Sequence, residues 1–309
     1  MGRSGVSPTP SAPVAVALSA GADSTALLLS AHRLWPGRVL ALHVNHGMQA
    51  AAIGFERQAA ELARTLGVPI RVEHLQVRVG PGQSPEDVAR GARYQALATM
   101  ARRAGACAVL LGHQSDDQAE TLMLALGRGA GLPGLAAMAP GFERHGMHFG
   151  RPFLALEGSA LRHWLREQAV PFVEDPSNQD LRLARNRIRH VLMPAWERCF
   201  PAFRDTLART ARHVAQAQVL MDELACIDLK HTGVPPSIAG LQSLSRERQA
   251  NALRSWIKSE AGRGPSTAQL ETLLNLLDRC RTRGHQIHLK VADGWVERAG
   301  ETLRWTPPV

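Results

Sequence analysis

The chain has 309 residues, of which 45% are hydrophobic and 20% charged, a balance that predicts two folded domains and excludes a disordered protein. Its formal net charge is +9, and only three of its 36 basic residues are lysines. Arginine-rich basic proteins commonly bind polyanions. RNA is therefore the first candidate partner, ahead of a membrane surface.

No apolar run approaches the roughly 18 residues of a membrane span, so no membrane segment is expected. Residues 1–13 are rich in Ser, Pro and Gly and lack the apolar core of a signal peptide, which predicts a flexible tail. We therefore expect a cytoplasmic protein. The four cysteines form no CxxC pair and predict reduced thiols rather than a zinc, iron–sulfur or dithiol site; they are Cys107, Cys199, Cys226 and Cys280.

The first predicted element is a buried strand over residues 14–18, which runs into a small, hydroxyl-rich loop at residues 19–24. An apolar run over residues 26–34 predicts a helix after this loop. A helix N-terminus offers unpaired N–H groups to an anion, and Gly21 lets the backbone approach a ligand closely. The loop is neither a Walker loop nor a GxGxxG turn, so a phosphate site and a plain strand-to-helix turn both stay open at this point.

Strands and helices alternate over the next hundred residues. The apolar runs predict strands at residues 38–44, 69–75 and 107–111, and helices at residues 55–66, 84–104 and 116–126. This alternation predicts an α/β fold with a doubly wound, mostly parallel sheet, whose ligands bind beyond the carboxyl ends of the strands. The loops at residues 19–24, 43–48 and 112–117 should therefore converge on one crevice, which favours the phosphate interpretation.

The second half of the chain is less regular. Residues 127–150 are glycine-rich and predict a flexible segment over the site. The pattern then predicts a helix at residues 159–169, a turn at 174–178, a basic run at 182–190 and a long helix from residue 196 to about 226. After a Gly-Val-Pro-Pro boundary at residues 233–236, the chain predicts helices at residues 245–261 and 266–278 and strands near 285–291 and 295–305.

Several motifs give the chain a family resemblance. Residues 19–24, Ser-Ala-Gly-Ala-Asp-Ser, resemble the SGGxDS signature of the PP-loop (N-type ATP pyrophosphatase) superfamily, which cleaves ATP to AMP and pyrophosphate. Together with further motifs, the chain resembles the tRNA(Ile)-lysidine synthetase family from residue 14 onward; these motifs occupy residues 43–48, 90–94, 112–121, 128–135, 174–178, 185–189 and 244–277. One departure is Ala20, where the superfamily usually has Gly. If that position needs a positive φ, Ala costs roughly 1 kcal/mol or more.

The resemblance implies a catalytic PP-loop ATP pyrophosphatase domain (adenine nucleotide alpha hydrolase-like) at residues 14–195, a linking helix at 196–232 and a smaller, mixed, tRNA-binding domain at 233–309. It also implies a two-step reaction in which ATP adenylates the wobble cytidine of the isoleucine tRNA with a CAU anticodon. The ε-amine of free L-lysine then displaces AMP and gives lysidine. The implied cofactors and partners are ATP, Mg²⁺, tRNA and L-lysine, with a homodimer as one possible assembly.

The resemblance assigns roles to individual residues. The ATP-binding residues would be Ser19, Ala20, Gly21, Ala22, Asp23, Ser24, His43, Gly112 and His113. Asp23 and Asp117 would bind Mg²⁺, and Asp23, Asp117, Glu120 and Arg189 would be catalytic. Asn178, Arg185 and Arg187 would contact tRNA or substrate.

Two of these assignments also have an argument from spacing. Asp117 and Glu120 lie three residues apart at a predicted helix start and so share one face, where they could hold Mg²⁺ or the lysine ammonium groups. The alternative is that two acids stabilise the helix N-terminus. His43 and His46 look like a metal pair in isolation, but such a pair on a loop is more often structural or adenine-lining, so no zinc is assigned. The tryptophans of the smaller domain, Trp256, Trp295 and Trp305, should be core, with stacking of one exposed ring on an RNA base as the alternative.

Two other functions match parts of the sequence. A PP-loop enzyme that 2-thiolates tRNA shares the first loop and the tRNA partner, but such enzymes use closely spaced cysteines, which this chain lacks. A non-catalytic RNA-binding protein with a degenerate nucleotide fold has no use for acids beside a polyanion. The presence of Asp23, Asp117, Glu120 and Arg189 therefore argues against it.

Overall fold

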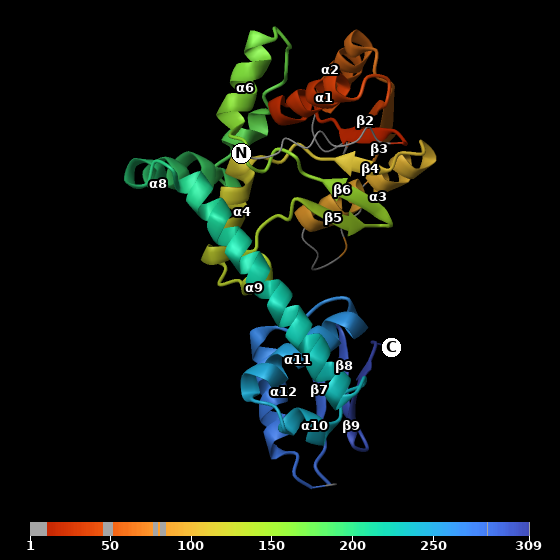
Figure 1. Ribbon diagram of the computed structural model, residues 1–309, viewed down its shortest axis with the longest axis vertical. Coiled ribbons are helices and arrows are strands. Elements are labelled where there is room, and N and C mark those ends of the chain that lie inside the picture. Colours follow the sequence, from red (N-terminus) through yellow and green to blue (C-terminus); the bar gives the residue numbers. More distant parts are fainter. Residues whose placement is uncertain (1–10, 46–51, 77–79, 81–84, 283, 309) are drawn as a thin grey trace, which may run out of the picture. The chain divides into compact units, whose positions relative to one another are not determined.

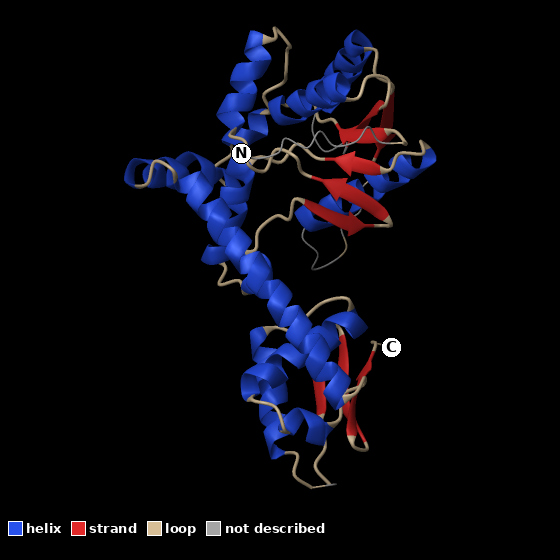
Figure 2. Cartoon of the chain, viewed as in Figure 1, coloured by secondary structure: helices blue, strands red, loops and turns tan. Residues whose placement is uncertain are grey.

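A computed structural model describes residues 11–308 except residues 46–51, 77–79, 81–84 and 283. Most of the predicted tail and His46 lie outside the described residues. The chain divides into two compact units, Met1–Arg212 and His213–Val309, and the division falls inside helix α9 (Phe203–Thr232). Each unit contains its own sheet (Figures 1 and 2).

The first unit is built on a six-stranded sheet in the order β3-β2-β1-β4-β6-β5. Every neighbouring pair is parallel except β5 and β6, which confirms the predicted doubly wound, mostly parallel sheet. The strand order reverses between β1 and β4, and ligands of such sheets bind at this switch point. The strands are β1 (Val14–Ala17), β2 (Val39–Asn45), β3 (Ile70–His74), β4 (Ala108–Leu110), β5 (Gly141–Arg144) and β6 (Met147–Gly150).

Helices cover both faces of this sheet (Figure 1). Side chains of α1 (Ala22–Leu34), α2 (Ala52–Leu66) and α6 (Gly158–Glu167) form one buried cluster with Val16 of β1. Side chains of α3 (Pro85–Arg103) form a second cluster that contains Ala15 of the same strand. Successive residues of a strand point to opposite faces, so β1 is buried on both sides, as its uninterrupted apolar sequence predicts.

The segment predicted as flexible, residues 127–150, is structured in the first unit. Helix α4 (Ser115–Gly127) and the short α5 (Leu132–Leu135) precede an antiparallel hairpin of β5 and β6. His145 and Gly146 make the hairpin turn with φ of 52° and 66°, the positive values that a two-residue hairpin turn requires. Phe142 stacks on Phe149 with ring centroids 5.2 Å apart, and both rings meet Tyr94 of α3 edge-on, which anchors the hairpin to the core. The prediction was wrong because glycines at both strand ends hide the alternating pattern.

The basic segment folds into short helices before the long one. These are η1 (Pro176–Gln179), α7 (Ala184–Arg187), the π-helical turn η2 (Ile188–Leu192) and α8 (Met193–Cys199). The predicted long helix therefore does not start at Trp196, which lies in α8. Pro201 disfavours the helical conformation at Phe200, whose φ and ψ are −138° and 83°, so α9 begins after this break and continues to Thr232.

The second unit packs three helices on one face of an antiparallel sheet. The helices are α10 (Ile238–Gln242), α11 (Arg246–Ala261) and α12 (Thr267–Arg279), and the strands are β7 (His288–Val291), β8 (Gly294–Ala299) and β9 (Thr302–Thr306). Ser245 and Ser266 cap α11 and α12. Trp256 is 1% exposed and central to this core, Trp305 is partly buried against it, and Trp295 is 36% exposed.

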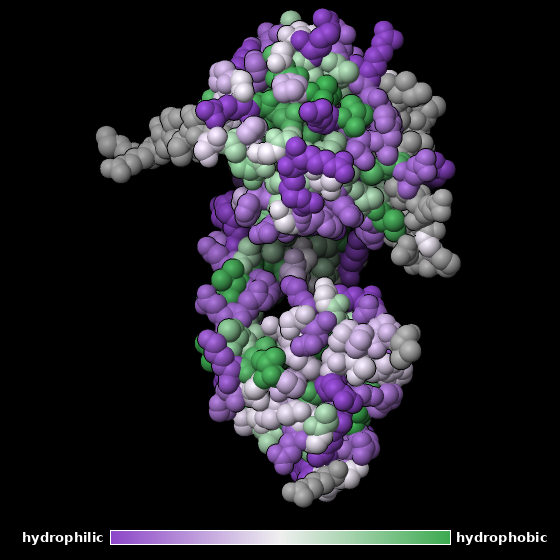
Figure 3. All heavy atoms as spheres, turned by 90° about the vertical axis from the view of Figure 1, so that its right-hand side faces the viewer, coloured by the Kyte–Doolittle hydropathy of each residue, from purple (hydrophilic) through white to green (hydrophobic). Residues whose placement is uncertain are grey.

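Among the described residues, no helix is both long and apolar enough to cross a membrane. Hydrophilic side chains occupy most of the face shown in Figure 3.

Candidate active site

The loop at residues 19–24 ends β1 and starts α1. Gly21 is the N-cap of α1, and no side chain of the described residues caps this helix. Its first-turn amides therefore lack the acceptor that most helices provide, which makes the loop suited to an anion. Two hydroxyls stabilise the turn: Ser24 Oγ donates to the Gly21 carbonyl at 3.1 Å, and the Ser19 and Ser24 Oγ atoms lie 3.0 Å apart.

Ala20 adopts the left-handed conformation, with φ of 67°. The chain is held there because the Val173 amide donates to the Ala20 carbonyl at 2.9 Å. An L-residue in this region costs roughly 1–2 kcal/mol relative to glycine. The Ala20 methyl group is fully buried in the core cluster, and burial of one such group contributes about 0.8 kcal/mol. The cost of the departure from the superfamily pattern is therefore partly offset by packing.

Two cavities open on either side of this loop. The first has a volume of about 440 Å³ and is lined by apolar side chains on β1, β2, α3 and the end of β4, including Leu42, Val44, Leu97 and Leu111. The second has a volume of about 600 Å³ and is lined mainly by polar and charged groups. Both cavities share one set of loop residues: Ser19, Gly21, Asp23, Ser24, Val173 and Asp175. A ligand with an apolar end and a charged end would fit across the loop.

Asp23 lies at the junction of the two cavities. Burial, helped by the negative charge of Asp117, raises its pKa from 3.8 to about 6. In the described part of the structure its Oδ1 atom is buried without a hydrogen-bond partner. An orphaned carboxylate oxygen in a charged cavity fits a cation ligand.

The surroundings of Asp23 fit Mg²⁺ better than a metal held by protein alone. No group of three or more His, Cys, Asp or Glu side chains converges on one point in the described ranges. Mg²⁺ is commonly held by one or two carboxylates plus substrate phosphates and water, so Asp23 can serve as its protein ligand. Asp117, the other predicted ligand, has both oxygens engaged: Oδ2 accepts from the Gln114 amide at 3.1 Å and Oδ1 from Arg185 at 3.2 Å.

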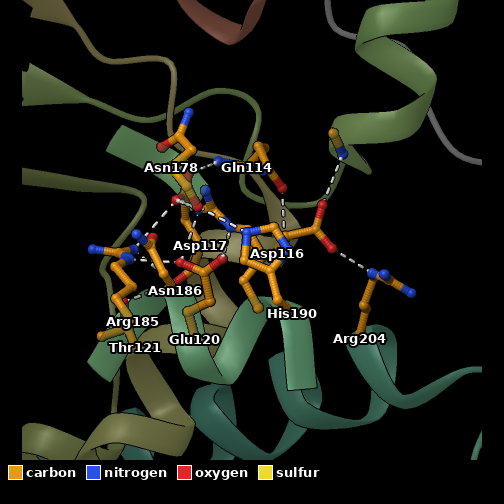
Figure 4. A network of polar contacts seen from close by, with 12 residues as sticks. Gln114, Asp116, Asp117, Glu120, Thr121, Asn178, Arg185, Asn186, His190 and Arg204 are labelled. Atoms are coloured by element: carbon orange, nitrogen blue, oxygen red, sulfur yellow. Dashed lines mark hydrogen bonds and ion pairs between the residues drawn. The ribbon is translucent and has the colours of Figure 1, made fainter. Parts of the chain in front are cut away.

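Glu120 forms the centre of an ion-pair cluster behind Asp117 (Figure 4). Its side chain is 0% exposed, and it accepts from Arg185 Nε at Oε2 and from Arg189 Nε at Oε1, both at 2.6 Å. The acids come from α4, and the arginines from α7 and η2. Both Glu120 oxygens are thus committed to arginines, and the cluster orients those two guanidinium groups. Burial also raises the pKa of Asp117.

The other basic residues occupy different positions. Arg189 and Asn178 line the second cavity, and the Asn178 carbonyl pairs with His190 Nε2 at 2.8 Å. Arg187 is exposed and donates to two backbone carbonyls of its own segment. Arg185 does not line either cavity but contacts Glu120 and Asp117. Sequence reasoning treated Arg185 and Arg187 alike, whereas the fold gives them separate environments.

Both predicted histidines line the first cavity. His43 is buried, its Nδ1 lies 2.8 Å from the Leu18 carbonyl, and burial lowers its pKa. The pKa of His113 falls to about 3 through burial and the positive charge of neighbouring arginines, chiefly Arg151. His113 is therefore neutral at pH 7, and within the described ranges its buried Nδ1 has no partner. Gly112, the remaining predicted residue, lies beside it.

Several lining residues were missed as site residues, and four of them carry charge at the cavities or lie beside the PP-loop. Arg93 lines the first cavity, Arg162 the second, and Val173 and Asp175 both. Arg93 belongs to the Arg-Gly-Ala-Arg-Tyr motif at residues 90–94, so a signal for it was present. Asp175 belongs to the motif at residues 174–178, but Arg162 and Val173 carry no local signal, because only the fold brings them to the loop.

The uncapped loop at the switch point, with an apolar cavity on one side and a charged one on the other, defines an ATP-using enzyme of the PP-loop class. The family model of the PP-loop domain matches residues 4–196, and that of the TilS substrate binding domain matches residues 237–304. A tRNA(Ile)-lysidine synthase from Polaromonas naphthalenivorans (strain CJ2) is 53% identical over 293 residues, which are 95% of this chain and 89% of the relative. The chain belongs to the tRNA(Ile)-lysidine synthase family.

Further relatives agree with this assignment. A tRNA(Ile)-lysidine synthase from Burkholderia pseudomallei (strain K96243) is 42% identical over 92% of this chain, which spans 59% of that longer relative. The solved structure of the U34-tRNA thiolase NcsA from Methanococcus maripaludis has a TM-score of 0.59 at 15% identity, covering 70% of this chain and 75% of that one. At this identity the likeness confirms the PP-loop fold alone.

Proposed function

We propose that this chain ligates free L-lysine to the wobble cytidine of the isoleucine tRNA with a CAU anticodon, releasing AMP and pyrophosphate. The observation that carries the proposal is the placement of Asp23 and the uncapped α1 N-terminus between an apolar and a charged cavity. ATP has a matching shape, with a flat apolar base at one end and a charged triphosphate at the other. The family membership supplies the acceptor.

ATP would bind across the loop. The adenosine would occupy the apolar cavity, where neutral His113 offers an unpaired ring nitrogen, and the phosphates would meet the amides that follow Gly21. Mg²⁺ bound by Asp23 would neutralise charge on the phosphates. The side chains of Ser19 and Ser24 hold the turn that presents these amides.

The reaction then proceeds in two displacement steps, and the protein holds the reacting groups in place for each. The cytosine carbonyl oxygen attacks the α-phosphorus, the bond to the β-phosphate breaks, and pyrophosphate leaves. The ε-amine of lysine next attacks C2 of the activated base, AMP leaves with the former carbonyl oxygen, and the nitrogen loses a proton. Adenylation is needed because a carbonyl oxygen is a poor leaving group and AMP is a good one. Holding three substrates in register supplies much of the rate.

The ion-pair cluster around Glu120 would shape the part of the site that receives the RNA acceptor. Arg189 lines the charged cavity while Glu120 fixes its guanidinium, so Arg189 can contact the RNA or the adenylated base. Asp117 lies beside this arginine and remains the predicted partner of a lysine ammonium group. Glu120 would act through Arg185 and Arg189 as a positioning residue.

The acceptor is an RNA loop, which fits an arginine-rich chain with a net charge of +9. Sequence-specific recognition of RNA usually targets unpaired bases, and an anticodon loop supplies them. Arg187, exposed on α7, is a predicted backbone contact. As a tRNA-modifying enzyme the protein is expected in the cytoplasm, and a homodimer stays a prediction for mass measurement in solution.

The adenylation step can be tested alone. Protein, Mg²⁺ and ATP labelled at the α-phosphate are incubated with the isoleucine transcript in the absence of lysine. The proposal predicts label on the RNA, which unlabelled lysine then releases as AMP. Label that never reaches the RNA, in a folded protein that binds ATP, would contradict it. The thiolation alternative predicts no lysine-dependent release, and three of the cysteines are exposed and isolated in sequence.

A further inference from the structure

Arg162 occupies a fixed position beside the PP-loop. It lies on α6, whose neighbouring residues Leu161 and Leu165 are buried in the same core cluster as Leu27 and Leu28 of α1. This packing fixes α6 against the helix that the PP-loop starts. The side chain of Arg162 lines the charged cavity together with Ser19, Asp23 and Ser24 of the loop and Ser159 of its own helix.

The arginines that line this cavity differ in whether they have a carboxylate partner. Arg189 is paired with Glu120, and Arg204 is paired with Asp116 at 2.5 Å and Glu197 at 2.6 Å. Arg162, by contrast, makes no hydrogen bond or ion pair within the described ranges of the chain. A partly buried guanidinium without a carboxylate lacks the partner that usually compensates its lost hydration. The cavity is therefore built to receive an anion at this position.

The anion belongs on the loop side of the cavity. The positive charge of Arg162 opposes the upward shift in the pKa of Asp23, so its field reaches the loop carboxylate. A Cβ added at Gly158, one turn before Arg162, would lie 3.0 Å from Arg162 Nη1 and 3.0 Å from Asp116 Oδ2. Because Gly158 has no side chain, the Arg162 guanidinium has room beside Asp116 of α4. Arg162 therefore lies on the wall of the charged cavity near both the loop carboxylate of Asp23 and Asp116 of α4.

We propose that Arg162 binds the β- and γ-phosphates of ATP and stabilises the pyrophosphate that leaves. This role rests on the proposed use of ATP across the loop. When the bond between the α-phosphorus and the bridging oxygen breaks, its electron pair stays with pyrophosphate, whose negative charge rises. A guanidinium meets such a group with two parallel hydrogen bonds, and preorganised charge of this kind is worth most where charge develops.

The first test compares ATP with AMP, which lacks the two outer phosphates. Equilibrium dialysis is carried out with the full chain, Mg²⁺ and no tRNA, for wild type and the Arg162→Gln and Arg162→Lys variants. Loss of a charge-assisted contact predicts ATP binding weakened roughly 10- to 100-fold in Arg162→Gln, with AMP binding unchanged. Arg162→Lys should recover part of the loss, because it keeps the charge but not the bidentate geometry. Arg166→Gln, an exposed arginine on the same helix, is the matched control and should bind both nucleotides normally.

The outcomes separate this role from others. Equal weakening of ATP and AMP with a lower Tm would assign Arg162 a structural role and overturn the proposal. Unchanged ATP binding with a raised KM for lysine would overturn it in favour of recognition of the amino-acid carboxylate. Because the dialysis contains neither tRNA nor lysine, a failure of the lysine-transfer function would leave the comparison of ATP with AMP intact.

Discussion

Gly112 lies directly against the backbone of Asp23. A Cβ built on Gly112 would be 3.0 Å from the carbonyl carbon of Asp23 and 3.0 Å from the amide nitrogen of Ser24. Both neighbours are backbone atoms of the first turn of α1, so neither can rotate away. The glycine is therefore required for close approach, since its φ lies outside the positive range. The loop after β4 thereby sets the position of the PP-loop.

Gly112→Ala should displace the PP-loop by a few tenths of an ångström or more. A small misplacement of reacting groups can lower a rate on the order of 100-fold, so we expect a loss of this size in adenylation. Single-turnover release of pyrophosphate measures it. Gly91→Ala is the matched control, because Gly91 lies in α3 with open space around the added methyl group. That variant should adenylate normally and gain about 0.5–1 kcal/mol of stability. Normal adenylation in Gly112→Ala would refute the close-contact argument.

Asp23→Asn should stabilise the fold at neutral pH while abolishing adenylation. The folded pKa of Asp23 is about 6 and the unfolded value is 3.8, so the folded state holds the proton more tightly. Stability from this group is present below pH 3.8 and is lost as the pH rises through 6. Allowing for partial solvation, the ionised form costs about 1–3 kcal/mol, which the amide avoids.

Urea unfolding at a series of pH values measures this effect. The stability difference between Asp23→Asn and wild type should be largest above pH 6 and vanish near pH 4. A difference that stays constant across this range would show that ionisation of Asp23 is not its source.

Glu120→Gln should strongly destabilise the first unit. The substitution leaves Arg185 and Arg189 without the buried carboxylate that both contact at 2.6 Å. Removal of one partner from a buried ion pair typically costs about 3–5 kcal/mol. Glu197→Gln is the control, because that acid is 50% exposed in its pair with Arg204 and should contribute less than about 1 kcal/mol. Chemical unfolding of both variants tests the contrast, and equal losses would contradict it.

Arg187→Gln should weaken tRNA binding through one phosphate contact. The expected signature is a shallower dependence of log K on log salt, by about one contact, with little change in ATP binding. Filter binding at several salt concentrations gives the slope. An unchanged slope would remove Arg187 from the RNA interface.

The centre of the parallel sheet could be predicted because its strands are short, mainly apolar runs. Residues 14–18 and 39–42 are apolar at successive positions, which indicates burial on both faces, the environment of a central parallel strand in a doubly wound sheet. The β5–β6 hairpin could not be predicted in this way. Its turn places His145 in a left-handed conformation, whereas turn prediction looks for glycine or asparagine at such a position. Pro201 is a sequence signal for the helix break at Phe200, which the predicted long helix did not include.

Only part of the candidate site could be predicted from the sequence. Motifs located Asp23, Gly112 and His113, but a motif states no geometry for the position of Ala20, whose φ of 67° depends on its contact with Val173. Arg162 looks like any surface arginine on an amphipathic helix. Its lack of an acid partner appears only when α4, α6 and η2 are brought around one cavity.

The central claim is lysine transfer to one tRNA, and labelled lysine measures it most directly. Purified protein is incubated with ATP, Mg²⁺ and labelled L-lysine, with either the isoleucine CAU transcript or the methionine tRNA that carries the same anticodon. The account predicts ATP-dependent label on the isoleucine transcript and none on the methionine tRNA. Folded, ATP-binding protein that leaves the isoleucine transcript unlabelled would contradict it.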